Sequence, residues 1–295
     1  MTVTTRVVLV HRRTELDDAL ARHGTHGQAA FFLSSRGQDI GELETRHART
    51  QSALATVAAS IPRDWRSGRI ERADLPRFLF EPDDIVVVVG QDGLVANVAK
   101  YLNGQPVIGV NPEPGRNAGV LVTQTPEAAG PLLRNAARAD AELRTMVQAA
   151  TDDGQLLMAV NEIFVGHASH QTARYTLALP DGRVERQASS GLIVSTGTGA
   201  TGWCRSVANQ RGSSIRLPAP TAPELAWFVR EAWPSPATGT ELVEGTLESA
   251  ALAVNVESDR LVAFGDGIEP DALQLSWGQR LTVGLATRHL RLLRS

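Results

Sequence analysis

Cysteine is nearly absent from this chain of 295 residues, which contains Cys204 and no other. A single cysteine cannot form a disulfide within the chain, and it cannot supply a cysteine-based metal site. Apolar runs long enough to cross a bilayer are also missing, and the N-terminal segment is strand-like rather than typical of a signal peptide. These absences favour a reducing compartment, and they predict a cytoplasmic protein with no membrane partner.

The sequence also lacks an excess of charge of one sign. It contains 29 Lys and Arg against 32 Asp and Glu, a formal net charge of −3, and no basic block that could follow a nucleic-acid backbone. We therefore expect no nucleic-acid partner. Hydrophobic residues make up 42% of the chain and charged residues 21%, which is typical of a globular protein with a sizeable core.

The first third of the chain alternates between strand-like and helix-like segments. The residues at 86–89 are all valine, as in a strand that is buried on both faces of a parallel sheet. Strand, glycine turn, helix and strand together form a βαβ unit. The spacing predicts strands at 7–10, 85–89 and 106–110, and helices from residue 15, over 43–61 and over 94–102.

The pattern changes after residue 115. A helix is predicted over about 127–150, and the short runs that follow predict strands at 156–165, 173–179, 191–195, 251–256, 261–264 and 281–285. Short strands separated by turn signals are typical of antiparallel sheets. We therefore predict an α/β domain with a parallel sheet at 1–122, a mainly antiparallel β domain at 123–280, and a C-terminal segment at 281–295 that can return to the first domain, with the ligand in the cleft between the domains.

The predicted strand at 85–89 ends at the turn Gly90-Gln91-Asp92-Gly93. Glycines at such a turn let the backbone approach a phosphate without interference from Cβ, and anionic ligands bind at this edge of open α/β sheets. Asp92 would then project into the crevice. The four residues alone favour a simpler interpretation, in which Asp92 only caps the helix that follows.

Two further stretches place polar side chains at the ends of strands. Asn161 and Glu162 interrupt an apolar segment, where the carboxylate either binds a partner such as a sugar diol or faces water at the strand end. The strand at 191–195 runs into a loop rich in glycine and hydroxyl groups that ends at Trp203. Such a loop either binds a polar ligand or is plain connecting structure, and it lacks the lysine of a Walker motif.

In order and content, these three stretches resemble the NAD kinase family, which shares a superfamily with diacylglycerol and sphingosine kinases. The family signature is Gly-Gly-Asp-Gly after a strand, then an Asn-Glu pair, then a run similar to Asp-Gly-Leu-Ile-Val-Ser-Thr-Pro-Thr-Gly-Ser-Thr-Ala-Tyr. The resemblance covers the chain from about residue 85 to its end. It implies the two-domain fold of that family, and transfer of a phosphoryl group from ATP or polyphosphate, with Mg²⁺ or another divalent cation, to the ribose 2′-hydroxyl of NAD or NADH.

The resemblance also implies roles for individual residues. Asp92 matches the catalytic aspartate, the general base of the family, and Gly90, Gln91 and Gly93 match the turn that the donor phosphates approach. A homodimer or homotetramer is implied, and no metal ligand from the protein. The implied nucleotide-binding residues are Asn161, Glu162, Ser190, Ser195, Thr196, Thr198, Gly199, Thr201 and Trp203. The pair Asp266-Gly267 matches an Asp-Gly before the final strands of the family, and we predict a hairpin turn there.

Departures from the family pattern predict a divergent member and leave two alternatives open. Gln91 replaces a glycine where donor phosphates are expected, and a side chain there is costly if φ is positive. This substitution motivates a catalytically silent nucleotide-binding regulatory protein as one alternative. Ser190 replaces an aspartate. That change motivates the other alternative, a kinase of another hydroxylated compound such as a nucleoside, a sugar or a lipid.

Overall fold

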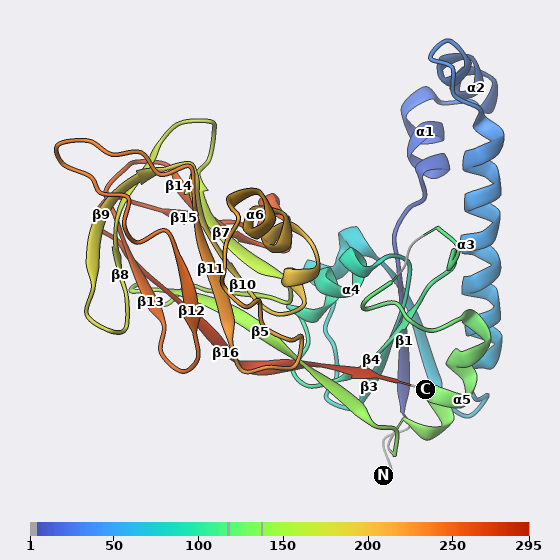
Figure 1. Cartoon of the computed structure of the whole chain (residues 1–295). Coiled ribbons are helices and arrows are strands. Elements are labelled where there is room, and N and C mark those ends of the chain that lie inside the picture. Colours follow the sequence, from blue (N-terminus) through green and yellow to red (C-terminus); the bar gives the residue numbers. More distant parts are fainter. Residues whose placement is uncertain (1–4, 117–118, 137, 295) are drawn as a thin grey trace. The chain divides into compact units, whose positions relative to one another are not determined.

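The computed structural model describes residues 5–116, 119–136 and 138–294, and its contacts divide the chain into two compact units (Figure 1). Unit 1 comprises Met1–Glu142 and Arg291–Ser295, and unit 2 comprises Leu143–Leu290. The boundaries predicted from the sequence were 122 and 280. In the structure the chain stays with unit 1 as far as Glu142, because α5 (Ala129–Asn135) packs against the long helix α3 (Ile40–Ser60).

Unit 1 is built on a parallel sheet with the strand order β2-β1-β3-β4, and the last residues of β16 add a further parallel strand beside β4. All six residues of β3 are buried, as the run of valines predicted. The strands predicted at 7–10, 85–89 and 106–110 are confirmed. The bounds are β1 (Arg6–His11), β2 (Arg66–Glu71), β3 (Asp84–Val89), β4 (Pro106–Val110) and β16 (Arg280–Leu293).

The helices of unit 1 begin where side chains satisfy their first free N–H groups. Thr14 caps α1 (Glu15–His23): its hydroxyl accepts from the N–H of Asp17, whose carboxylate accepts in turn from the N–H of Thr14. The helix α2 (His26–Ser34) was not predicted from the sequence; it lies with α1 at one end of α3 in Figure 1. The fourth helix is α4 (Asp92–Ala99). Among the described residues, no helix is long and apolar enough to span a membrane.

The helix predicted over 127–150 is wrong. Its first part is the 3₁₀ turn Pro126–Ala128 followed by α5, but its second part is the strand β5 (Ala141–Thr151). Val147 of β5 pairs with Ala159 in an antiparallel ladder. Periodicity alone cannot separate a short apolar helix from a strand, and here the distant pairing partner decides the outcome.

Unit 2 consists of two mainly antiparallel sheets that enclose one hydrophobic core. One sheet contains β16-β13-β8-β9 together with β5 and β6, and the other has the order β12-β11-β10-β7-β14-β15. The fold class predicted from the sequence is confirmed. The bounds are β6 (Leu156–Ala159), β7 (Glu162–His167), β8 (Ala173–Ala178), β9 (Val184–Ser189), β10 (Gly191–Ser195), α6 (Trp203–Arg211), β11 (Leu225–Arg230), β12 (Glu244–Leu247), β13 (Leu252–Val256), β14 (Leu261–Gly265) and β15 (Leu273–Leu275).

Candidate functional site

Asp92 is the first residue of α4, and its carboxylate holds a loop that follows β4. Oδ2 accepts from the N–H of Val120 at 2.8 Å, and Oδ1 accepts from Leu121 at 2.8 Å and from Val122 at 2.9 Å. The interpretation of Asp92 as the cap of the following helix is therefore wrong, because the N-cap of α4 is Gln91, which makes no side-chain cap bond. Three of about four acceptor positions of this carboxylate are used by one loop.

The backbone at Gln91 is extended, with φ −102° and ψ 165°. Any residue adopts this conformation, so the replacement of the family's glycine causes no backbone strain. Neighbouring Gly90 is closely packed, since a Cβ added there would lie 3.0 Å from Cδ2 of Leu94, whereas a Cβ added at Gly93 would meet nothing within 4 Å. The turn therefore tolerates the glutamine side chain, and Gly90 is the member of the turn whose packing favours glycine.

Substituting Gln91 by glycine is expected to lower the free energy of unfolding by about 0.5–1 kcal/mol. Glycine gains backbone freedom in the unfolded chain and relieves no strain in the folded one. Urea unfolding of the two proteins measures the difference. A more stable glycine variant would contradict the extended backbone at this position.

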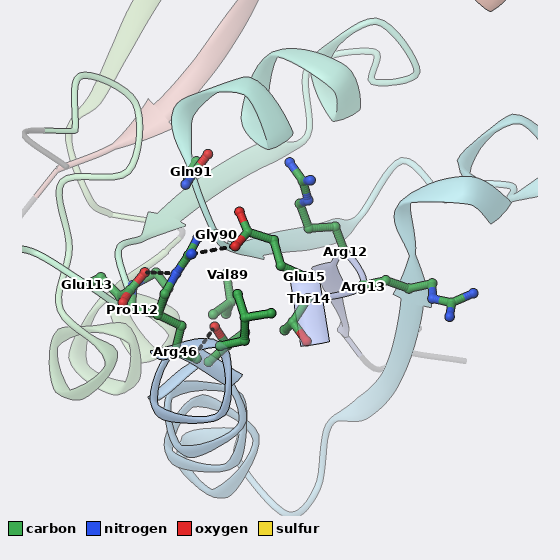
Figure 2. Close-up of a pocket in the computed structure, with 12 residues that line it drawn as sticks. Arg12, Arg13, Thr14, Glu15, Arg46, Val89, Gly90, Gln91, Pro112 and Glu113 are labelled. Carbon is green, nitrogen blue, oxygen red and sulfur yellow. Dashed lines mark hydrogen bonds and ion pairs between the residues drawn. The ribbon is translucent and has the colours of Figure 1, made fainter. Parts of the chain in front are cut away.

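A cavity lies at the carboxyl edge of the unit 1 sheet (Figure 2). The strand order places β2 on one side of β1 and β3 on the other, so the crossovers diverge between β1 and β3. Open α/β sheets bind ligands in the crevice at such a topological switch point. The cavity is lined by residues that follow these strands: Arg12, Arg13 and Thr14 after β1, Gly90 and Gln91 after β3, and Pro112 and Glu113 after β4.

Arg46 of α3 lies in this cavity between two carboxylates, those of Glu15 and Glu113 (Figure 2). Glu113 is only 9% exposed, and its Oε2 is 3.9 Å from Nε of Arg46. Its Oε1 lies 3.6 Å from Nη1 of Arg49 and accepts no hydrogen bond. Arg46 and Glu113 were not predicted as site residues from the sequence, where the one available signal was that Glu113 closely follows a predicted strand.

In unit 2, Asp266 fixes the backbone where β7 begins. Its carboxylate accepts from the N–H of Val160 at 3.0 Å and from that of Asn161 at 2.6 Å, and its own N–H donates to the carbonyl of Glu162 at 3.0 Å. Asp266 and Gly267 have φ of 54° and 69°, in the left-handed region that suits a sharp turn. The pair that was predicted as a turn after β14 therefore also positions Asn161 and Glu162.

Glu162 is in an unusual electrostatic environment. Burial, and then the negative charge of Asp266, raise the pKa of its carboxyl from 4.5 to about 7. No hydrogen bond or ion pair joins its side chain to another described residue, although the side chain is not fully buried. A half-buried carboxylate without a donor is a candidate for contact with a ligand.

The loop after β10 is tied to the residues just before β7. Oγ of Ser195 donates to the carbonyl of Asn161 at 3.2 Å, and Oγ1 of Thr196 donates to the carbonyl of Val160 at 2.5 Å. A Cβ added at Gly199 would lie 2.3 Å from the carbonyl oxygen of Asn161, so this position requires glycine. Oγ1 of Thr198 is buried without a hydrogen-bond partner.

Ser190 and Trp203 line a different cavity of unit 2, with a volume of about 640 Å³. The ring of Trp203 stacks on Phe164 with 5.7 Å between centroids, and the guanidinium of Arg230 lies 5.4 Å from the Trp203 centroid. Asn161 and Glu162 are not among the described residues that line this cavity. Thr201 lines neither cavity; its hydroxyl donates to the carbonyl of Thr198 at 2.8 Å.

The predicted site residues thus fall into three groups. Asp92 and its turn belong to unit 1, and all the other predicted site residues belong to unit 2. Within unit 2 the structure links Asn161 and Glu162 to the loop after β10, and it places Ser190 and Trp203 together in the cavity of 640 Å³. Among the described residues, no group of three or more His, Cys, Asp or Glu is arranged to hold a metal ion.

Comparison with known proteins gives consistent matches. The NAD kinase of Methanoregula boonei is 34% identical over 127 residues, 42% of this chain and 46% of that protein. The NAD kinase of Methylococcus capsulatus is 33% identical over 180 residues, 57% of each chain, and that of Chlorobaculum tepidum is 23% identical over 226 residues, 75% of this chain and 74% of that protein. The chain thus spans about half the length of the first two relatives. No family model matches.

The fold is also similar to a solved structure, yeast NADH kinase complexed with NADH. The TM-score is 0.62 with 14% sequence identity, and the match covers all of this chain and 84% of that one. The parallel sheet of unit 1, with the Gly-x-Asp-Gly turn after β3, and the antiparallel sheets of unit 2 form the two-domain fold that this chain shares with that kinase. Together with the sequence relatives, this shared fold supports the resemblance of the chain to the NAD kinase family.

Proposed function

We propose that this protein transfers a phosphoryl group from ATP or polyphosphate to the 2′-hydroxyl of the ribose of NAD or NADH. The observation that carries this proposal is the hydrogen-bonded arrangement of the start of β7 and the loop after β10 in a chain with NAD kinase relatives. Transfer of a phosphoryl group needs mainly positioning and neutralisation of charge, together with a carboxylate near the attacking hydroxyl.

We propose that the donor binds at the cavity at the carboxyl edge of the unit 1 sheet. Gln91 lines this cavity with its backbone, whereas the N–H of Gly90 already donates to the carbonyl of Val110. Arg12, Arg13 and Arg46 offer positive charge to phosphate oxygens. The two carboxylates that now pair with Arg46 are the groups with which a phosphate would compete. Nucleotide phosphates in α/β proteins occupy this kind of switch point.

The resemblance implies Mg²⁺ or another divalent cation, which would arrive with the donor. Mg²⁺ in such sites is held by one or two carboxylates together with the phosphates of the substrate. Glu113 fits this role, because its buried Oε1 accepts no hydrogen bond in the cavity that we assign to the donor. When bound, the ion would supply positive charge against the donor phosphates.

We propose that the acceptor binds at the start of β7. Asn161 and Glu162 together offer a donor and acceptors to adjacent ribose hydroxyls, and the buried hydroxyl of Thr198 is a further group without a partner. Ser190 and Trp203 would contact another part of the dinucleotide in the aromatic cavity, where a ring can stack and Arg230 can meet a phosphate.

The experiment that tests this function is direct. Purified protein with ATP, Mg²⁺ and NAD, or NADH, is expected to form NADP or NADPH, detected with a dehydrogenase that accepts only the phosphorylated dinucleotide. Parallel reactions with polyphosphate identify the donor, and light scattering tests for the homodimer or homotetramer that we expect in the cytoplasm. Absence of product with both donors would rule out this function. Turnover of a nucleoside, sugar or lipid, or a dinucleotide-induced rise in Tm without turnover, would then identify the alternative.

A further inference from the structure

We propose that unit 2 carries a ligand site apart from the residues that the resemblance assigns to the dinucleotide. The site is a cavity of about 420 Å³ at one edge of the two sheets, which we call the edge cavity. It would take a small uncharged compound that presents a carbonyl oxygen at its inner end. None of the predicted site residues is among the described residues that line it. This inference does not depend on the proposed kinase activity.

The edge cavity opens between the two sheets of unit 2. One sheet supplies the turn between β8 and β9, and the other supplies Trp227 of β11, together with β12 and the loop that leads from it to β13. In the described part of the chain, β12 is the end strand of its sheet and pairs only with β11. Three residues of the hydrophobic core, Leu179, Trp227 and Leu247, line the cavity. The core is therefore open to a ligand at this edge.

The indole of Trp227 brings a polar group to the edge cavity. The residue is only 2% exposed, and its Nε1 donates no hydrogen bond to any described residue. The N–H is nevertheless not fully enclosed, so it faces the open space of the cavity. Buried tryptophan N–H groups usually have an acceptor. Because the described part of the chain offers none here, the acceptor must come from water or from a ligand.

Gly245 of β12 determines where this ring lies. Trp227 and Gly245 are directly opposite each other in the pairing of β11 with β12. A Cβ added at Gly245 would lie 2.7 Å from Nε1 of Trp227 and 2.8 Å from both Cε2 and Cζ2, so any larger residue would displace the ring. Glycine inside a strand often marks a close approach of this kind. It lets the edge of the ring that carries the N–H lie against a residue that itself lines the cavity.

The walls of the edge cavity favour an uncharged compound. Leu179 and Leu247, which are 8% and 5% exposed, form apolar walls. Nε of Arg183 donates to Oδ2 of Asp181 at 2.8 Å, so the charges of these two lining residues compensate each other. Glu248 also lines the cavity but is exposed, and water weakens the field of its carboxylate. A single unpaired donor with apolar walls is complementary to a carbonyl group on an apolar body.

Binding of benzamide tests the proposal, because benzamide is an uncharged amide on an apolar ring. In spectra of protein labelled with ¹⁵N, the indole N–H resonance of Trp227 is expected to move downfield as benzamide is added. The dissociation constant is expected to be about 0.1–10 mM, as for other ligands of about nine non-hydrogen atoms. Trp277, which is 64% exposed, gives the comparison resonance and should not move.

Two variants make the test specific. Ala250→Trp places a large side chain at an exposed lining position and is expected to weaken binding at least about tenfold, because the cavity is then filled. Trp227→Phe keeps a ring but removes the N–H, and it is expected to weaken binding about 3–10-fold, the usual contribution of one uncharged hydrogen bond. The backbone amide of Gly245 reports binding in that variant. Ala237→Trp, at an exposed alanine of the same unit outside the cavity, is the matched control and should bind as wild type.

Circular dichroism checks folding, and Ala250→Trp decides the question if Trp227→Phe does not fold. Equal movement of the Trp227 resonance in wild type and Ala250→Trp would overturn the proposal. So would the absence of any movement with benzamide, N-methylacetamide and caprolactam up to about 50 mM, well above the expected dissociation constant. Movement with protein concentration alone would also overturn it, because the occupant would then be a second copy of this chain. None of these measurements uses turnover, so failure of the proposed kinase activity is detected separately.

Discussion

Replacing Asp92 with alanine is expected to lower the free energy of unfolding of unit 1 by about 3–5 kcal/mol. The carboxylate accepts from three backbone N–H groups of the loop at 120–122. A hydrogen bond to a charged group contributes about 1.5–3 kcal/mol, and the expected total is below three times this value because water can hydrogen-bond to the N–H groups that alanine leaves without an acceptor. Urea unfolding measures the loss in free energy of unfolding. Hydrogen exchange at Val120, Leu121 and Val122 shows where in the structure the loss occurs, because these amides are expected to lose protection first.

Two companion variants make this prediction specific. Asp92→Asn keeps one acceptor oxygen and is expected to lose less stability than alanine. Asp83→Ala removes an exposed aspartate from the start of the same strand–turn–helix segment and should change stability by less than about 0.5 kcal/mol. A loss below about 1 kcal/mol for Asp92→Ala would mean that the loop does not depend on this carboxylate.

The second large effect is expected in the pH dependence of stability. Glu162→Gln should raise the free energy of unfolding by about 3 kcal/mol at pH 8 and leave it nearly unchanged at pH 4. The folded pKa is about 7 and the unfolded value is 4.5, a difference of about 2.5, and each pKa unit corresponds to about 1.4 kcal/mol.

The sign follows from which state holds the proton. Below pH 4.5 Glu162 is protonated in both states, so it costs no stability. As the pH rises from 4.5 to 7 the unfolded chain loses the proton first, and the wild-type protein becomes progressively less stable; above pH 7 the full cost remains. Urea unfolding at pH 4, 6 and 8 measures this trend, with Glu248→Gln, at an exposed glutamate of the same unit, as control. A Glu162→Gln benefit that is equal at all three values would contradict the raised pKa.

The positions of the functional stretches were readable from the sequence because each depends on local chemistry. Four consecutive valines predicted the buried strand β3, and the glycine turn that ends it lies at the carboxyl edge of the parallel sheet. The strand β10 was predicted with its observed bounds, Gly191–Ser195. Asn161 and Glu162 were identified because polar residues in an apolar segment are expensive without a partner.

Other features depended on contacts between residues far apart in the chain. Arg46 and Glu113 meet in one cavity although they lie 67 positions apart in the sequence, and no spacing rule connects a helix to a loop after a later strand. The prediction of helix over 127–150 was wrong for the same reason, since β5 is a strand through its pairing with β6. A side chain at position 91 was expected to cause strain only if the backbone there had a positive φ. The backbone of Gln91 is extended, so there is no such strain.

By itself, the sequence determined the fold class, the family resemblance and which polar residues stand at strand ends, because burial patterns and glycine turns are local properties of a chain. Only the tertiary structure decided what those residues do with their charge. In the folded protein the carboxylate of Asp92 accepts hydrogen bonds from three backbone N–H groups of a distant loop. Glu162 lies close to Asp266, which is more than 100 positions later in the sequence. The pKa of a carboxyl depends on its burial and on its neighbours in space, and the local sequence around the residue determines neither of these.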